Sequence, residues 1–463
     1  MKKLYNHNII KLFYICLTTI VLQACDSFID TDLPNDKINT QDVFKDIYTT
    51  KAALNDIYAQ IRQNSVLSGD QKGLGFLISL YTDDLTSMAR PNSNNGFYEM
   101  NNNLITANNE AISSIWNTNY KIIYNLNSFI DGLSSSTYIP EDQKKTLLSE
   151  ASFLRALIYY YLVQIFGDIP YTKTTDYSYN NKINKTNYNL VLNNIENDLI
   201  FALQGLSNTY RSNERIYPNK ATASLLLSKL YLLQKNFSKA EEITTELILD
   251  KTYELETDIS RTFKKNAKST LWQFSPQESS LATQEAYTYI INTLPVTTHH
   301  LSSNIISLFK PTDTRFKNWV NSIDKEQEKW FYNFKYKNKT NNTDEYSIIM
   351  RLEEAYYVLI ESLIYQNKTR EAINYMNVLR QYRNLPSIQM EQSASDLLKI
   401  MLEDSRLEFF CEHGHRFFDL KRNNKLEIIQ VTKPNWKTIH TLFPIPEKEI
   451  LLNPNLLPQN NGY

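Results

Sequence analysis

Two pairs of residues have types and spacing that could support catalysis or metal binding. His413 and His415 are separated by one residue, and Asp83 and Asp84 form the most suggestive pair of carboxylates. A zinc site needs three or four ligands, and the sequence has no further Cys/His cluster to supply the rest. A glycosidase needs two carboxylates facing each other across a cleft, whereas adjacent residues usually point apart. Because nucleophile-elbow, zinc-protease and phosphate-loop motifs are also absent, we predict no metal, no cofactor and no enzymatic activity.

The segment around the two histidines is better explained as the exit of a helix into a loop. Gly414 is expected to adopt an unusual backbone angle there, because glycine has no side chain to clash. Arg416 and Asp419 are three residues apart and are expected to form a local ion pair. Cys411 is expected to be a small buried residue and not a nucleophile.

Aromatic side chains set among polar residues offer another chemistry, the binding of sugars. The C–H face of a pyranose stacks on a flat ring, while Asn, Asp, Gln and Arg bond the hydroxyl groups. If each contact removes roughly 50 Å² of apolar surface, it contributes on the order of 1 kcal/mol, so several rings give micromolar to millimolar binding. The alternative for each ring is packing in the core of its own segment. The predicted platform rings and polar contacts are Phe97, Tyr98, Trp319, Trp330 and Tyr332, with Asp83, Arg90 and Asn101.

The N-terminus has the pattern of an export signal followed by a lipid attachment site. Three lysines precede or open the apolar run of residues 12–22, which is too short to cross a bilayer, since that takes about 20 apolar residues. The run ends in LQAC, which has the shape of a lipobox whose Cys25 thiol would carry a diacylglycerol. We predict a signal peptide over 1–24, a lipidated tether over 25–39 and a single domain over 40–463. The alternative is an ordinary cleaved signal with a coincidental cysteine.

Charge and composition narrow the class of protein further. The chain of 463 residues has 49 Lys and Arg against 50 Asp and Glu, so it carries no basic stripe of the kind that binds nucleic acid. It contains 31 Tyr but only 9 Gly. So few glycines disfavour a fold with many tight β-turns and favour helices.

Apolar residues at spacings of three and four predict a mainly α-helical protein. The clearest stretch runs from Pro140 to Phe166 and is stopped by Gly167-Asp168-Ile169-Pro170. Similar runs cover 41–63, 110–132, 188–204, 219–234, 238–250, 348–366, 369–383 and 395–411.

Four of these runs pair into helical hairpins of tetratricopeptide type, at 219–249 and 351–385. Small residues such as Ala240 and Ala372 let the paired helices approach closely. The helical scaffold is predicted mainly over 40–63, 110–250 and 348–422. The periodicity fails at about 64–109 and 255–345, which are predicted to form an irregular ligand-binding subdomain. Trp272 and Phe274 alternate there as in a short strand, so at least one should be buried.

Several separated strings resemble the RagB/SusD family of outer-membrane nutrient-binding lipoproteins. They are FLRAL at 153–157 with FGDIP at 166–170, EHGHRFFDLKR at 412–422, and LFPIP, NPN and NGY at 442–446, 453–455 and 461–463. Together with the lipobox they arrive in the family's order and span nearly the whole chain. The family's sugar-contacting residues lie in variable loops, so none can be carried over to a position here.

The resemblance implies a cell-surface protein with a four-repeat tetratricopeptide scaffold and an irregular ligand-binding subdomain. Family members cap a SusC-like, TonB-dependent outer-membrane barrel and pass it oligosaccharides or, in some cases, peptides. The acidic residues Asp26, Asp30 and Asp32 resemble surface-export signals of such proteins. The expected function is therefore capture of an oligosaccharide for import. Three alternatives stay open: a peptide-binding member, a tetratricopeptide scaffold for protein segments without a small ligand, and a hydrolase.

Overall fold

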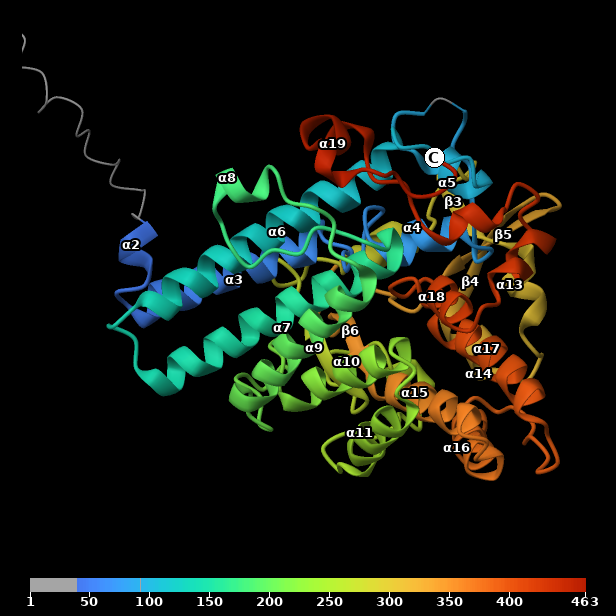
Figure 1. Cartoon of the computed structure of the whole chain (residues 1–463). Helices are drawn as coiled ribbons and strands as arrows, with labels where there is room; N and C mark the ends of the chain where they lie inside the picture. Colours follow the sequence, from blue (N-terminus) through green and yellow to red (C-terminus); the bar gives the residue numbers. More distant parts are fainter. Residues whose placement is uncertain (1–39, 92) are drawn as a thin grey trace, which may run out of the picture.

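The computed structural model describes residues 40–91 and 93–463 and is mainly helical, as predicted (Figure 1). Cys25, the predicted signal peptide and the predicted tether lie outside the described residues. Among the residues that are described, no helix is both long and apolar enough to cross a membrane.

The α-helices, in chain order, are α2 Thr40–Val43, α3 Ile47–Asn64, α4 Leu74–Tyr81, α5 Phe97–Asn102, α6 Glu110–Ser135, α7 Glu141–Phe166, α8 Tyr177–Asn180, α9 Tyr188–Gly205, α10 Lys220–Leu233, α11 Phe237–Leu249, α12 Gln284–Tyr289, α13 Ser303–Leu308, α14 Thr314–Trp319, α15 Leu352–Tyr365, α16 Thr369–Tyr382, α17 Ala394–Phe409, α18 His415–Arg422 and α19 Glu447–Leu452. The strands are β1 Leu85–Ser87, β2 Thr270–Phe274, β3 His299–Leu301, β4 Val320–Lys325, β5 Glu328–Asn333 and β6 Ser347–Arg351. The 3₁₀ helices of the described residues are η1 Ile259–Arg261, η2 Leu426–Val431, η3 Thr438–Thr441 and η4 Pro454–Leu456.

The long helix α7 lies at the centre of the helical layer and packs against α6 on one side and α9 on the other (Figure 1). It begins after Pro140 and carries Glu141 and Asp142 in its first turn, where carboxylates favour the helix dipole. It ends at Gly167, whose φ of +76° suits glycine. Almost every residue of its C-terminal two thirds is buried, so this part of the helix is enclosed on all sides.

The two predicted hairpins form and stack on each other. Helices α10 and α11 make the first and α15 and α16 the second, and α11 packs directly against α15. Ala240, Ala355 and Ala372 are fully buried at these crossings, as the expected close approach requires. Segments about a hundred residues apart thereby form one layer, seen along the lower edge of Figure 1.

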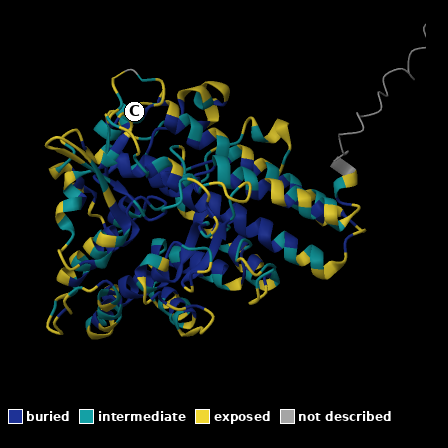
Figure 2. Cartoon of the chain, turned by 180° about the vertical axis from the view of Figure 1, so that it is seen from behind, coloured by how far each residue is buried: buried dark blue, intermediate teal, exposed yellow. Residues whose placement is uncertain are grey.

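Among the described residues, three small antiparallel sheets form, β1–β3, β2–β6 and β4–β5. All of their strands except β6 lie in the segments where helical periodicity fails. The helix predicted from residue 348 begins only at Leu352, because residues 347–351 pair with β2 as strand β6. All five residues of β2 are buried, which confirms the strand predicted around Trp272 and Phe274. Strand β6 leads directly into α15, so the β2–β6 sheet is attached to the hairpin layer through the chain itself. Figure 2 shows a continuous buried interior with exposed residues on loops and outer helix faces.

Buried ion pairs fasten the irregular segment to the helical layer. Glu408 of α17 accepts hydrogen bonds from Arg351 at 2.7 Å and from Arg383 at 2.6 and 2.8 Å, and Arg315 of α14 lies at 3.4 Å. Burial alone would raise the pKa of Glu408, but the surrounding guanidinium groups outweigh it and hold that pKa well below its usual value. The buried network comprises the cations Arg315, Lys335, Arg351 and Arg383 and the anions Asp313, Glu353, Glu408 and Glu412.

Candidate functional site

The segments that carry the predicted ligand contacts come together at one corner of the molecule, in the upper right of Figure 1. Strands β1 and β3 pair in antiparallel register, helix α5 packs against β1, and β5 packs against β3. Residues near positions 85, 100, 300 and 330 therefore share one region of the structure. The predicted ligand-contacting residues in this region differ in their exposure to solvent.

Helix α5 holds three of the candidates within a turn and a half. The backbone is left-handed at Gly96 before the helix, with φ +72°, and at Asn103 after it, with φ +51°, which fixes its length. Phe97 is half-buried and its ring packs edge-on against Phe76 at 5.2 Å. Tyr98 is half-buried, and Asn101 lies one turn later on the same side of the helix. The helix thus places a ring beside an amide.

Asn101 is held by a lysine from the far end of the chain. Its side-chain oxygen accepts from the Ser87 backbone N–H at 3.0 Å, and its carbonyl accepts from Lys433 Nζ at 2.7 Å. Lys433 also donates to the Leu80 carbonyl at 2.9 Å. Burial lowers the pKa of Lys433 to about 8. The amide nitrogen of Asn101 takes part in no hydrogen bond with the described residues and can donate to a ligand.

A polar hollow of about 420 Å³ opens beside α5. Asp83 and Asn101, two of the predicted contacts, both line it. The remaining wall consists mainly of amide, hydroxyl and ammonium groups that sequence reasoning missed. They come from Asn102, Ser302, Ser303, Asn304, Thr432, Lys433 and Asn435. No local motif could have revealed them, because they converge from segments up to about 350 residues apart.

The carboxylate of Asp83 is already engaged by arginines and is 4 % exposed. It lies 3.2 Å from Arg406 and 3.2 Å from Arg416, while Asp84 accepts from Arg406 at 2.8 Å. Burial alone would raise the pKa of Asp83, but the two arginine charges outweigh it and lower that pKa. The adjacent carboxylates thus serve to hold α17 and α18 against the end of α4. The expected local pair of Arg416 with Asp419 is wrong, since the side chain of Arg416 reaches across to Asp83.

The four other predicted contact residues differ in how exposed they are to solvent. Trp319 is 1 % exposed, and Phe263 packs edge-on against its ring at 5.4 Å, so it offers no face to a ligand in this structure. Tyr332 is 7 % exposed and sits beside half-buried Trp330 on the same face of β5, because side chains two apart in a strand point the same way. Arg90 is exposed in the loop after β1. The structure therefore offers Tyr98, Asn101, Trp330 and Arg90 to solvent and encloses Trp319 and most of Tyr332.

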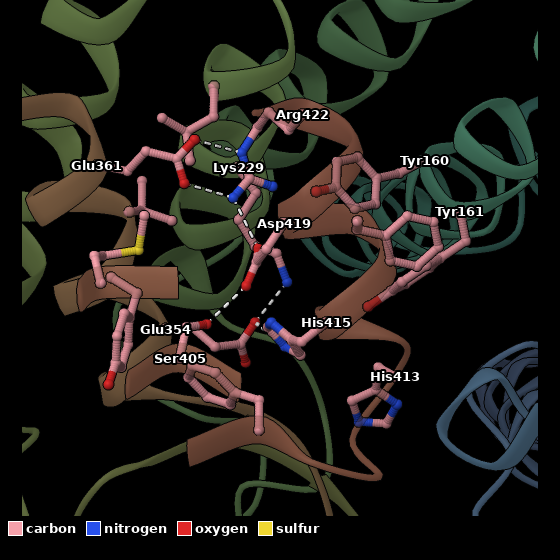
Figure 3. A pocket seen from close by; sticks show the side chains of 16 residues that line it. Tyr160, Tyr161, Lys229, Glu354, Glu361, Ser405, His413, His415, Asp419 and Arg422 are labelled. Atoms are coloured by element: carbon pink, nitrogen blue, oxygen red, sulfur yellow. Dashed lines mark hydrogen bonds and ion pairs between the residues drawn. The ribbon is translucent and has the colours of Figure 1, made fainter. Parts of the chain in front are cut away.

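The two histidines line a separate, small cavity of about 40 Å³ (Figure 3). His415 stacks on Phe409 with ring centroids 4.2 Å apart and lies 3.7 Å from Glu354, whereas His413 points away toward the Ile348 carbonyl. Burial lowers the pKa of both imidazoles. No group of metal-ligating side chains occurs among the residues described.

Two other expectations for this segment are met. Gly414 adopts a left-handed conformation with φ +79° at the start of α18. Cys411 is 5 % exposed, and burial raises the pKa of its thiol, so it is a buried residue of low reactivity.

Comparison with known proteins agrees with the fold and with the strings in the sequence. Residues 28–232 match the family model described as SusD-like, starch-binding associating with outer membrane, and residues 318–463 match the SusD family model. The chain belongs to the SusD/RagB family. SusD family glycan-binding proteins are non-catalytic, which agrees with the expectation that this chain is not an enzyme.

Three proteins illustrate how similar this chain is to known SusD-like proteins. SusD-like protein P2 of Formosa agariphila is 27 % identical, over 91 % of this chain and 93 % of its own. A laminarin-binding SusD-like protein superposes with a TM-score of 0.76 at 20 % identity, covering 91 % of this chain and all of that one. Surface glycan-binding protein A from Bacteroides uniformis gives a TM-score of 0.76 at 18 % identity, covering 89 % and 99 %. At these identities the two structures establish the shared tetratricopeptide-type fold.

Proposed function

We propose that this chain is a lipoprotein, anchored through Cys25 to the outer face of the outer membrane, that binds an oligosaccharide at the α5 surface. The observation that carries the proposal is the polar hollow beside α5, which is lined mainly by amides and hydroxyls. Tyr98 is half-buried on the same short helix as Asn101 and Asn102, two of the lining residues. Amide and hydroxyl groups exchange forked hydrogen bonds with sugar hydroxyls, and a flat ring takes the C–H face of the sugar. The outer-membrane and starch-binding description of the matching family model supports the same role.

The partner in this proposal is a SusC-like, TonB-dependent transporter that receives the oligosaccharide. Micromolar to millimolar affinity, expected for a few ring contacts and hydrogen bonds, is weak enough for the sugar to be handed on. Co-purification of a β-barrel with the chain from native membranes supports the partnership. A chain that leaves native membranes alone contradicts it.

The binding site is tested by titrating the chain with a panel of neutral oligosaccharides and a panel of peptides. Tyr98→Ala and Asn101→Ala should each weaken sugar binding about five- to tenfold, because each removes about 1 kcal/mol of contact. Tyr138→Ala serves as the control, since this tyrosine is 66 % exposed in the loop between α6 and α7, away from α5. Unchanged sugar binding in both α5 variants contradicts the assignment, and binding of peptides alone favours the peptide-binding alternative.

A further inference from the structure

A second groove lies between helix α6, the loop of residues 167–187 that includes α8, and helix α19. These elements run along the upper side of Figure 1, with α19 between the groove and α5. The groove has a volume of about 400 Å³, within the range of about 300–1,000 Å³ typical of small-ligand sites. None of its lining residues belongs to the polar hollow beside α5.

Aromatic rings from both walls face this groove. Trp116 and Tyr120 of α6 form its base, with ring centroids 4.7 Å apart. Tyr124, one turn further along α6, is 50 % exposed. Tyr177, at the start of α8, stands on the opposite wall and is 78 % exposed. Two accessible rings across a groove that is floored by indole and phenol can hold a flat, weakly polar ligand between them.

Polar side chains line the same groove as these rings. Asn117 and Asn181 are exposed, Glu449 of α19 is half-buried, and all three line the groove. Their side chains make no hydrogen bond with any described residue, so they are available to a ligand. Amides donate and accept, while the carboxylate accepts only. The combination suits hydroxyl groups, and the carboxylate repels an acidic ligand.

The groove is built before any ligand arrives. The Tyr120 hydroxyl donates to the Pro170 carbonyl at 2.9 Å, which ties the loop to α6. On the other side, Asn453 donates to the Ile183 carbonyl at 2.8 Å and Asn455 to the Lys182 carbonyl at 2.7 Å. Since both walls are already fixed, a ligand need not order them, and this lowers the cost of binding.

We infer that this groove is a second binding site for a neutral oligosaccharide, with Tyr124 and Tyr177 as stacking platforms and Asn117, Asn181 and Glu449 as partners for hydroxyl groups. The inference does not depend on the α5 surface, because the two sites share no residue. On this account one chain binds sugar at two places, and the two sites together retain a long chain better than either alone.

The test is calorimetric titration of the full chain with maltohexaose, laminarihexaose and a galacturonic acid hexamer, in variants that separate the sites. In a background of Tyr98→Ala and Asn101→Ala, a neutral hexasaccharide should still bind, and adding Tyr177→Ala should raise its Kd about five- to tenfold. Tyr177→Phe keeps the ring and should retain most of the affinity. Tyr48→Ala is the matched control, because Tyr48 is also 78 % exposed but lies on α3, away from the groove.

Several outcomes overturn the inference. No neutral hexasaccharide binding to the α5 double variant, while the unmodified chain binds, removes the second site and leaves the α5 site standing. No binding of either neutral sugar to the unmodified chain overturns both sites. Preference for the galacturonic acid hexamer contradicts the role given to Glu449. If Tyr177→Ala instead abolishes co-purification of a β-barrel and leaves the sugar titrations unchanged, the groove is a protein-docking surface and the inference is wrong.

Discussion

Replacing Glu408 by glutamine should disturb the junction between the ligand-binding segment and the helical hairpins. Its two oxygens accept from Arg351 and Arg383 and lie near Arg315, all of them buried. Glutamine keeps the volume but removes the charge, so four buried cations would face three remaining anions. Breaking a buried ion pair by removing one partner typically costs 3–5 kcal/mol, and we expect a loss of about that size in the free energy of unfolding.

Urea unfolding, followed by circular dichroism and by tryptophan fluorescence, measures this loss. Trp319 reports on the network itself, because Lys335 and Arg383 lie 5.2 and 5.3 Å from its ring centroid. The double variant Glu408→Gln/Arg383→Met should be more stable than Glu408→Gln alone. Removing one cation together with the anion leaves less uncompensated charge in the buried network.

The matched control is Glu254→Gln. Glu254 pairs with Lys268 at 2.7 Å, but both side chains are more than half exposed, so its loss should leave stability nearly unchanged. A loss below about 1 kcal/mol for Glu408→Gln would refute the account of the network as a buried, charge-balanced junction.

Three further changes are expected to alter stability in defined ways. Trp319→Ala should cost about 3–5 kcal/mol by urea unfolding because the ring is fully buried, and a loss under 1 kcal/mol would mean that the ring is not in the core. Gly414→Ala should cost about 1–2 kcal/mol from its φ of +79° alone, and its new methyl group would crowd Phe418 and Ile78 at 3.0 and 3.2 Å; an unchanged urea midpoint would contradict this. Burial raises the pKa of Glu285 from 4.5 to about 7, so the folded chain binds more protons than the unfolded chain between these values. Stability should therefore fall by roughly 3 kcal/mol as the pH rises from 4.5 to 7, and Glu285→Gln should flatten this slope in urea titrations at several pH values. An equally steep slope in that variant would assign the titration to another group.

Much of the helical scaffold could be predicted from the sequence, because local periodicity and end signals determine it. The helix predicted from Pro140 to Phe166 occurs as Glu141–Phe166, and the hairpins predicted at 219–249 and 351–385 occur as α10–α11 and α15–α16. In these segments the apolar stripe, the capping residues and the small residues at the crossings all favour the same structure.

The candidate site could be predicted only in part, because its geometry depends on distant residues. Trp319 lies among polar residues in the sequence, and this setting predicts an exposed, sugar-stacking ring. In the structure the ring is buried, and the cations beside it come from Arg351 and Arg383, more than thirty residues away. Asp83 likewise pairs with Arg416, 333 residues later. The hollow beside α5 draws its hydroxyls and amides from four separate segments, namely β1, α5, the start of α13 and the loop after η2. Short strands and long-range ion pairs leave no periodic signal in a single sequence.

The most direct test of the central claim is a crystal structure of the chain with the neutral oligosaccharide that binds most tightly in the titrations. We expect sugar density at the α5 surface, with a pyranose ring against Tyr98 and a hydroxyl within hydrogen-bonding distance of the Asn101 side chain. Sugar density elsewhere, with α5 and its hollow bare, would contradict the proposed capture site.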